Sequence, residues 1–400
     1  MPDVSSASTA PSEASDGNED KVEKNPDFQI AQWLFLLKTD QFKNDSAVKN
    51  SLMEAIKANE MAPYYEMVTK TLGFNADTSL LNQLRQKNEQ KIKELDAAIL
   101  DAEQNLGSIE VREAYLAKFN YLSRTGDKEA AESAFRQCFE KTVGHGNKLD
   151  LIFQMIRIGL FFDDLDLTTR NLDKARSLVE EGGDWDRRNR LKVYEGLHFM
   201  KIREFPKATT NFLDSVSTFT CSEILDYDTF VTYAVLCAML TLERVKLKEK
   251  VVRSAEIAEV LFRLPDLRQF LSSLYGSHYA EFFLQLANVE QKLKVDRYWA
   301  DHYRYYTREM RILAYNQLLE SYQSLTLDYM GQAFGVTAGF IDKELSRFIA
   351  AGRLHCKIDK VNGVVETTRP DNKNRQYQLF IKQGDHLLNK IQRLSRVINV

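Results

Sequence analysis

The stretch LTLDYMGQAFGVTAGFIDKELSRFIAAGRLHCKIDKVNGVVE, residues 325–366, decides the fold of the C-terminal part of the chain. It begins with two short amphipathic helix patterns joined by a tight glycine turn, and it continues with two strand-like runs joined by Val-Asn-Gly. Two such helices followed by a hairpin predict a winged helix, a module best known for reading the major groove of DNA. The module therefore raises the question of whether the chain binds nucleic acid or another partner.

The charges of the second predicted helix argue against DNA. Its buried side is predicted to consist of Phe340, Ile341, Leu345, Phe348 and Ile349. Asp342 and Glu344 would then meet the phosphates, and the outward side offers no Asn, Gln or Arg pair that reads a base. Residues 328–369 contain six Lys or Arg and five Asp or Glu, a net charge of +1, whereas phosphate neutralisation needs far more positive charge. We therefore expect this module to bind protein.

The predicted wing has a regular strand pattern. Leu354, Cys356 and Ile358 alternate with polar residues and are expected to face the core. The pair Asn362-Gly363 suits a type I′ hairpin turn. A sheet this small leaves an edge strand, whose unpaired backbone groups are a template for pairing with the edge of a neighbour.

The bulk composition is typical of a folded, soluble chain. Of 400 residues, 44% are hydrophobic and 28% are charged, and this length predicts two or more domains or an elongated repeat array. The formal net charge of -3 gives no basic field that would recruit nucleic acid or an anionic membrane. With 7 prolines and 17 glycines the chain has few helix breakers, which favours long helices.

The apolar runs and the cysteines indicate the cellular compartment in which the chain is expected. No apolar run is long enough for a bilayer, which needs about 20 residues, and the N-terminus lacks the apolar core of a signal peptide. The four cysteines lie far apart with no CxxC pair, and we interpret them as reduced thiols rather than as a disulfide frame or a zinc site. The expected location is the cytoplasm and the nucleus.

The N-terminal part of the chain divides into a tail and a helical region. Residues 1–26 are rich in Ser and acidic residues and nearly lack large apolar ones, so we expect them to be disordered. Residues 27–107 are expected to form helices, among them a long charged helix with an apolar stripe that skips one turn, at Asn88. A strut packed along the protein is favoured over a lone coiled coil. The stripe comprises Leu81, Leu84, Ile92, Leu95, Ile99, Ala102 and Leu106.

A weak repeat follows. The segment YLSRTGDKEAAESAFRQCF, residues 121–139, is similar to FMKIREFPKATTNFLDSVS, residues 199–217. The crossing-point alanines are 44 residues apart (131 to 175) and 33 residues apart (175 to 208), which brackets the periods of tetratricopeptide (TPR) and related repeats. Since one helical hairpin cannot bury its apolar face alone, residues 108–325 are predicted to stack as a TPR-like solenoid. The matching positions are Ala131, Ala175 and Ala208, with Phe135 and Phe212 one turn further on.

The chain is predicted to close with one long helix. The winged helix is assigned to residues 326–375 and the last helix to residues 376–400. The apolar residues of this helix keep heptad spacing, so the helix presents a seam, and binding to a partner is favoured over packing back on its own chain. The seam positions are Phe380, Gly384, Leu387, Ile391, Leu394 and Ile398. The predicted fold class is therefore mainly α.

No sequence pattern indicates catalysis, a cofactor or a metal. The chain has no GxxxxGK[ST], no GxGxxG after a strand and no HExxH, and its six histidines share no ligand spacing with carboxylates. The sequence therefore predicts that the chain is not an enzyme.

Arginines and aromatics interleave in RYWADHYRYYTREMR, residues 297–311, as they do in single-strand binders. On a helix the two types separate. Trp299, Tyr303, Tyr306, Met310 and Leu313 form one face, and Arg304, Arg308 and Arg311 lie nearly opposite. The aromatic face is interpreted as core, and the arginine face as solvated or as a protein contact.

A helical-repeat array that runs into a winged helix and ends in a seam helix resembles the PCI family, which is named after subunits of the proteasome lid, the signalosome and a translation initiation factor. Longer segments resemble the PCI subunits of the proteasome regulatory particle lid, and among these the family of the seventh non-ATPase subunit. They include NPDFQIAQWLFLL, IEVREAYLAKFNYLSRTGDKEAA and ELSRFIAAGRLHCKIDKVNGVVETTRP. The resemblance covers the chain from about residue 25 to its end.

This resemblance implies a non-catalytic scaffold in ubiquitin-dependent protein degradation. PCI subunits of the lid pair their winged helices edge to edge and gather their C-terminal helices in a bundle. The implied partners are other PCI subunits, the lid deubiquitinase and the ATPase ring, in a hetero-oligomer without nucleic acid or membrane. The candidate contacts are Leu354, Cys356, Ile358, Val364 and Glu366 in the wing, and Leu387, Leu388, Ile391, Leu394 and Ile398 in the seam, with Arg304, Arg308 and Arg311 as a further protein contact.

Two alternatives share the architecture. One is the paralogous PCI subunit of the signalosome, although the segment GGDWDRRNRLKVYEG, residues 182–196, favours the proteasome. The other is an RNA-binding PCI subunit of a translation initiation complex, which the charge count of the winged helix and the separate arginine face disfavour.

Overall fold

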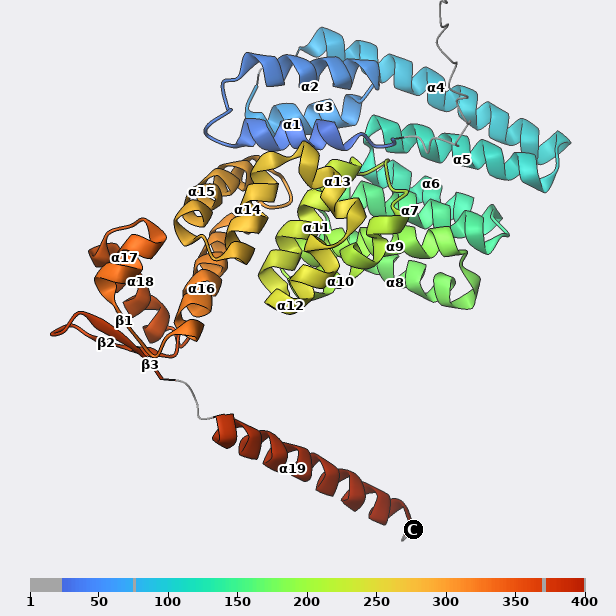
Figure 1. Cartoon of the computed structure of the whole chain (residues 1–400). Coiled ribbons are helices and arrows are strands. Elements are labelled where there is room, and N and C mark those ends of the chain that lie inside the picture. Colours follow the sequence, from blue (N-terminus) through green and yellow to red (C-terminus); the bar gives the residue numbers. More distant parts are fainter. Residues whose placement is uncertain (1–23, 75–76, 369–371, 399–400) are drawn as a thin grey trace, which may run out of the picture. The chain divides into compact units, whose positions relative to one another are not determined.

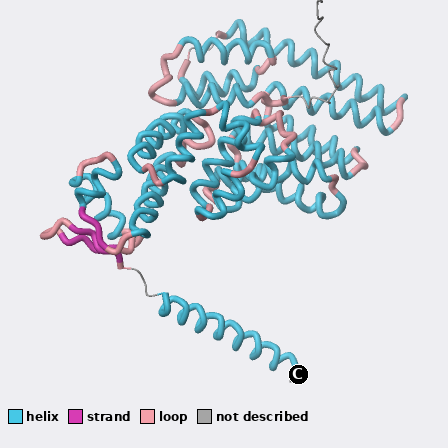
Figure 2. Tube along the Cα trace, in the orientation of Figure 1, coloured by secondary structure: helices cyan, strands magenta, loops and turns pink. Residues whose placement is uncertain are grey.

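The computed structural model describes residues 24–74, 77–368 and 372–398, so the disorder predicted for residues 1–26 concerns a segment that lies almost wholly outside the described residues. Helices dominate the described chain, and its strands gather in a small sheet close to the C-terminal helix in sequence (Figure 1, Figure 2). The chain divides into two compact units. One comprises residues 1–191 and 219–227, and the other comprises residues 192–218 and 228–400.

The first unit is helical throughout its described part. Aspartates cap the N-termini of α1, α2, α4, α6 and α8, where each side chain accepts a hydrogen bond from a backbone N–H of the first turn that has no partner inside the helix. The helices are α1 (Phe28–Lys38), α2 (Ser46–Ala58), α3 (Ala62–Leu72), α4 (Thr78–Asn105), α5 (Ser108–Thr125), α6 (Lys128–Lys141), α7 (His145–Phe162), α8 (Leu165–Gly182) and the start of α9 (Trp185–Lys201).

The long charged helix α4 packs against its own unit, as the strut interpretation predicts. Leu84, Ile99 and Ala102 of the predicted stripe are buried. The skipped turn is filled by Asn88, which is buried as well and whose Oδ1 accepts a hydrogen bond of 3.0 Å from the hydroxyl of Tyr121. A buried amide with a partner replaces an apolar residue at this turn without leaving an unpaired polar group.

The repeat predicted from the alanine pattern corresponds to the helix pairs α5/α6, α7/α8 and α9/α10. Ala131, Ala175 and Ala208 are fully buried in the second helix of each pair. In the third pair α9 also needs a small residue where it contacts α10. A Cβ added at Gly196 of α9 would lie 2.4 Å from the ring of Phe212 of α10. The small residues thus allow the helices of each hairpin to approach closely, and the predicted class of a helical-repeat chain that ends in a winged helix is confirmed.

The second unit continues with helices around an aromatic core. The rings of Phe205 and Trp299 stack with centroids 5.5 Å apart, and Tyr306 packs edge-on against Trp299 at 5.2 Å. The aromatic face predicted for residues 299–313 is therefore core at its centre. The elements are α10 (Phe205–Ser215), the 3-10 turn η1 (Val216–Thr218), α11 (Tyr227–Thr241), α12 (Arg244–Leu247), the π-helical turn η2 (Lys248–Val252), α13 (Ala255–Arg263), α14 (Pro265–Gly276), α15 (Tyr279–Val295) and α16 (Tyr303–Ser321).

The winged helix contains one strand more than the sequence pattern indicated. Leu325, which was expected to start a helix, is the centre of β1 (Ser324–Thr326), and α17 (Leu327–Phe334) and α18 (Ala338–Ala350) follow it. The wing consists of β2 (Cys356–Asp359) and β3 (Val364–Thr367), and the antiparallel sheet has the order β1-β3-β2. A three-residue strand is too short to show a period in sequence, so only its pairing with β3 reveals it.

The predicted type I′ turn of the wing is wrong. That turn requires positive φ at both central residues, yet Gly363 has φ 64° while Asn362 is not among the residues with positive φ. The strands are joined by the four residues 360–363 instead. The side chain of Asp359 organises this loop by accepting hydrogen bonds from the backbone N–H of Val361 at 2.9 Å and from the side chain of Asn362 at 2.8 Å, and these bonds lower the pKa of Asp359.

The last described element is the 27-residue helix α19 (Asn372–Ile398). Its start lies a few residues before the predicted start at residue 376. A search of the described helices for one both long and apolar enough to cross a bilayer finds none.

Candidate protein-interaction surfaces

The sheet of the winged helix has β2 at one edge. Within the described residues β2 pairs only with the central strand β3, so one row of its backbone N–H and C=O groups is not used by the sheet. Lys357 and Glu366 lie opposite each other in the register and both are exposed. The edge is therefore a short strand with charged residues beside it, which favours pairing with a selected neighbour over unspecific aggregation.

The wing residues predicted as contacts differ in their access to a partner. Leu354 and Cys356 are buried, as their core prediction required, and burial raises the pKa of the Cys356 thiol. Ile358 and Val364 are half-buried, and Glu366 is exposed. A partner at this edge would thus meet the backbone of β2 and the side chain of Lys357, whereas Glu366 lies one strand further in, on β3.

The second helix of the module differs from its predicted face at two positions. Phe340, predicted as buried, is 39% exposed because it lies in the first turn of α18, beside the stripe formed by Ile341, Leu345 and Phe348. Glu344, predicted as outward, is buried. Its carboxylate accepts a hydrogen bond of 2.9 Å from the hydroxyl of Tyr315 and lies 2.8 Å from Nη1 of Arg311.

The predicted arginine contact is partly used inside the unit. Arg311 joins α16 to α18 through Glu344. Arg308 is exposed and pairs at 3.1 Å with Glu309, a buried carboxylate that also binds Arg353. Arg304 is exposed, and its Nε donates to the hydroxyl of Tyr303. Of the three guanidinium groups, those of Arg304 and Arg308 are thus the more accessible to a partner.

Helix α19 carries the largest group of exposed apolar side chains. Every side chain of α19 whose exposure is described is exposed. Among the predicted seam positions, Leu387 is 60% exposed and Ile391 is 53% exposed. The other exposed apolar positions of the helix are Tyr377, Leu379, Phe380, Ile381, Leu388, Leu394, Val397 and Ile398.

The seam extends one position further toward the N-terminus than predicted. Tyr377 precedes Phe380 by three residues, and from there steps of three and four residues lead through Gly384, Leu387, Ile391 and Leu394 to Ile398. This spacing is the a/d pattern of a helix that packs against other helices. The signal for Tyr377 was present in the sequence but lay close to the assumed start of the helix.

The described residues hold no cluster of three or more His, Cys, Asp or Glu that could bind a metal ion. The four cysteines are buried and free. The prediction that the chain is not an enzyme stays a prediction.

Comparisons with known proteins match three successive parts of the chain. The family model described as 26S proteasome subunit RPN7 matches residues 77–250, the PCI domain matches residues 258–369, and the model of the 26S proteasome regulatory subunit RPN7/PSMD6 C-terminal helix matches residues 376–398. The C-terminal model thus covers all predicted seam positions of α19.

Relatives match over nearly the whole chain. The 26S proteasome non-ATPase regulatory subunit 6 of Dictyostelium discoideum is 49% identical over 96% of this chain and 100% of its own length. The homologue of this subunit in Arabidopsis thaliana is 50% identical over 94% of this chain and 98% of its own length. Subunit 1 of the COP9 signalosome complex of Arabidopsis thaliana is 26% identical over 49% of this chain and 45% of its own length.

The resemblance to a seventh non-ATPase subunit is corrected in its numbering, because these relatives are named non-ATPase regulatory subunit 6 and the family model is named RPN7. The chain belongs to the RPN7 family of 26S proteasome regulatory subunits with a PCI domain.

Proposed function

We propose that the chain is a non-catalytic structural subunit of the lid of the 26S proteasome regulatory particle. In this role it supports assembly, and thereby ubiquitin-dependent protein degradation in the cytoplasm and the nucleus. Its partners are the other PCI subunits, and through the lid the deubiquitinase and the ATPase ring.

The observation that carries this proposal is the exposed heptad seam of α19. Burying one Leu or Ile side chain contributes about 1.5–3 kcal/mol. A partner that buries the seam would therefore gain a large favourable free energy of binding. An isolated helix with such a seam is marginal in water unless tertiary contacts cover it. A bundle with the C-terminal helices of neighbouring subunits supplies these contacts.

A second surface supports the same role. The edge strand β2 can extend its sheet by pairing with the edge of another winged helix, with Lys357 beside the contact and Glu366 one strand away on β3. We propose that the wing and seam residues named from the resemblance are the contact sites. Leu354 and Cys356 are buried, so they contribute by holding β2 in position rather than by touching the partner.

The domain boundaries predicted from the sequence belong to the same proposal. They assign residues 27–107 to the N-terminal helices, 108–325 to the repeat array, 326–375 to the winged helix and 376–400 to the bundle helix.

The native assembly tests this function. The chain is tagged at its N-terminus and purified gently, and the mass and the subunit composition of the recovered particle are measured. We expect a very large particle that contains ATPase-ring and protease subunits. A smaller complex without ATPases would favour the signalosome alternative, and a free monomer would contradict the scaffold role.

A further inference from the structure

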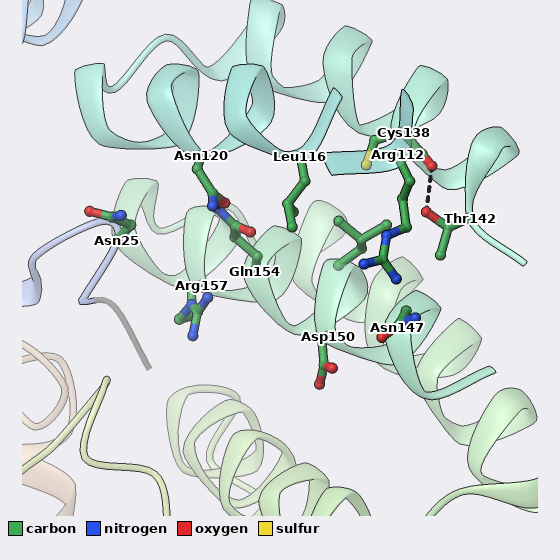
Figure 3. Close-up of a pocket in the computed structure, with 11 residues that line it drawn as sticks. Asn25, Arg112, Leu116, Asn120, Cys138, Thr142, Asn147, Asp150, Gln154 and Arg157 are labelled. Atoms are coloured by element: carbon green, nitrogen blue, oxygen red, sulfur yellow. Dashed lines mark hydrogen bonds between the residues drawn. The ribbon is translucent and has the colours of Figure 1, made fainter. Parts of the chain in front are cut away.

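A cavity of about 250 Å³ lies among α5, α6 and α7 of the first unit (Figure 3). Arg112, Leu116 and Asn120 line it from α5 at steps of four residues, so they share one face of that helix. The lining from α7 comprises Asn147, Asp150, Leu151, Gln154 and Arg157. The cavity is thus a trough with leucines at its middle and polar groups toward both ends.

Two guanidinium groups of this lining are incompletely bound. Arg157 is 6% exposed, and within the described residues its Nε has no hydrogen-bond partner. The carboxylate of Glu223 lies 3.8 Å from Nη1 of Arg157, beyond hydrogen-bond distance. Arg112 likewise has a buried Nε without a partner in the described part of the chain, and its Nη2 is 3.6 Å from the exposed Glu113. Such groups favour a carboxylate ligand.

The one acidic residue of the lining does not compete for these cations. Asp150 receives two hydrogen bonds from Arg187, at 3.0 and 2.7 Å, and this pairing raises the pKa of Arg187. Cys138 contributes a neutral thiol, because burial raises its pKa. The positive groups with unused hydrogen-bonding capacity are therefore those of Arg112 and Arg157.

The start of the described chain lies at one end of this trough. Asn25 lines the cavity, and Figure 3 places it at the end near Asn120 and Arg157, away from Arg112. The residues that precede it, 17–24, read GNEDKVEK and include Glu19, Asp20 and Glu23. These three residues lie outside the described part of the structure.

The lengths of the trough and of this segment agree. Arg112 and Asn120 are eight residues apart on a helix, which is about 12 Å, and four extended residues span about 13–14 Å. Glu23 is two residues from Asn25, at the Arg157 end, and Glu19 and Asp20 are six and five residues from Asn25, a separation in sequence that matches the distance to Arg112. The side-chain amide of Asn147 supplies donors and an acceptor for the backbone of an extended segment, and Asn120 supplies its N–H donors, since its Oδ1 already accepts a hydrogen bond of 2.8 Å from Nε2 of Gln154.

We propose that residues 19–23 of the chain bind in this trough as an extended acidic segment, with their carboxylates on Arg112 and Arg157. Because the segment is tethered directly at Asn25, its effective concentration at the trough is in the mM range for a short linker. A free acidic peptide therefore has to displace it.

The test uses the full chain and a fluorescein-labelled peptide of residues 13–24. In a variant with Glu19→Gln, Asp20→Asn and Glu23→Gln the trough is open to the peptide, and we expect fluorescence anisotropy to show binding at least about tenfold tighter than to the native chain. Adding Arg112→Glu to this variant is expected to lower the affinity again by about tenfold or more. The matched control is Arg136→Glu, which makes the same charge change at an exposed i,i+4 pair of α6 outside the cavity lining.

A charge exchange keeps the proposal falsifiable if Arg112→Glu affects folding. A peptide in which Glu19 and Asp20 are replaced by Lys is expected to bind the Arg112→Glu chain better than the native peptide does. Equal peptide binding by the native chain and the neutralised variant would overturn the proposal. Equal effects of Arg112→Glu and Arg136→Glu would overturn it as well, and binding of a scrambled peptide with the same affinity would place a different occupant in the trough.

Discussion

Helices α16 and α19 carry similar sequence patterns but differ in the burial of their apolar residues. Both are long, both have apolar residues at three- and four-residue steps, and both carry several arginines. In α16 the apolar residues Tyr306, Met310 and Tyr315 are completely buried, whereas Leu387 and Ile391 of α19 are more than half exposed. Periodicity therefore predicts that a helix has a face to bury, and it leaves open whether the same chain or another one covers it.

The polar residues of α16 explain part of the difference. Arg311 of α16 pairs with the buried Glu344 of α18, and the buried Glu309 of α16 binds Arg353, which follows α18. These two ion pairs attach α16 to the winged helix. No side chain of α19 whose exposure is described is buried, so no buried carboxylate of α19 forms an ion pair of this kind.

The largest effect is expected for charges in the α19 seam. Leu387→Asp combined with Ile391→Asp places two carboxylates in the predicted helix bundle. If each position contributes about 2 kcal/mol, as interface hot spots do, the affinity falls on the order of a thousandfold. The measurement is the fraction of tagged chain that co-purifies with the large particle.

The control for this experiment is Asn389→Asp with Gln392→Asp, which adds the same charge away from the seam of α19. We expect normal incorporation for the control, and unchanged helicity of the isolated chain for both variants. Normal incorporation of the seam variant would contradict the proposal that the seam of α19 packs in a helix bundle with partner subunits.

The second prediction compares the loss of stability when an apolar side chain is truncated in α16 and in α19. Met310→Ala in α16 removes a fully buried side chain and should lower the free energy of unfolding by about 2–5 kcal/mol. Leu387→Ala in α19 should change it by less than about 0.5 kcal/mol, because the side chain is exposed in the isolated chain. Urea denaturation of the two purified variants checks this contrast, and similar losses would mean that α19 packs on its own unit.

A smaller effect is expected at the buried carboxylate that joins α16 to α18. Glu344→Gln removes the charge that faces Arg311 and weakens the hydrogen bond from Tyr315, which should destabilise the fold by about 1–3 kcal/mol. Glu320→Gln makes the same chemical change at an exposed position of α16 and is the matched control. Thermal unfolding followed by circular dichroism distinguishes them, and equal midpoints would show that this ion pair contributes no net stability.

The smallest effect concerns the pH response of two histidines. Burial and the nearby Arg203 lower the pKa of His302, whose Nε2 lies 2.8 Å from the carbonyl oxygen of Lys201. The hydrogen bond to the Lys201 carbonyl and the nearby Asp301 favour the proton, whereas the ammonium group of Lys201 disfavours it, and the net shift of the pKa is downward. The unfolded chain thus binds a proton more readily, so stability present above the ordinary value of 6.5 is lost as the pH falls.

The measurement compares melting midpoints at about pH 7.5 and about pH 5.5, on either side of the ordinary histidine pKa. His302→Gln should reduce the difference between the two midpoints. His386→Gln on the exposed helix α19 should leave it as in the native chain. An unchanged difference in the His302 variant would assign the pH response to other groups.

Much of this architecture was predictable from local patterns. The crossing-point alanines, the glycine turn of the winged helix and the alternation of Leu354 with Cys356 each reflect a steric requirement of one element, and such requirements are visible in a short window. The third strand β1 was not predictable, because its three residues carry no period and it exists only by pairing with β3, some 40 residues later. Glu344 was misassigned because a carboxylate was counted as solvated, whereas Arg311 and Tyr315 from another helix make its burial favourable.

The sequence by itself determined that this protein is a helical-repeat chain with a winged helix and a heptad-patterned last helix, since helix periods, caps and small residues act over a few neighbouring positions. Only the tertiary structure decided which of these faces are covered. The apolar face of α16 is filled by aromatic side chains from α10 and from the residues before α16, while the face of α19 stays exposed. Burial depends on which distant segments meet, and that is a property of the folded chain rather than of any single stretch.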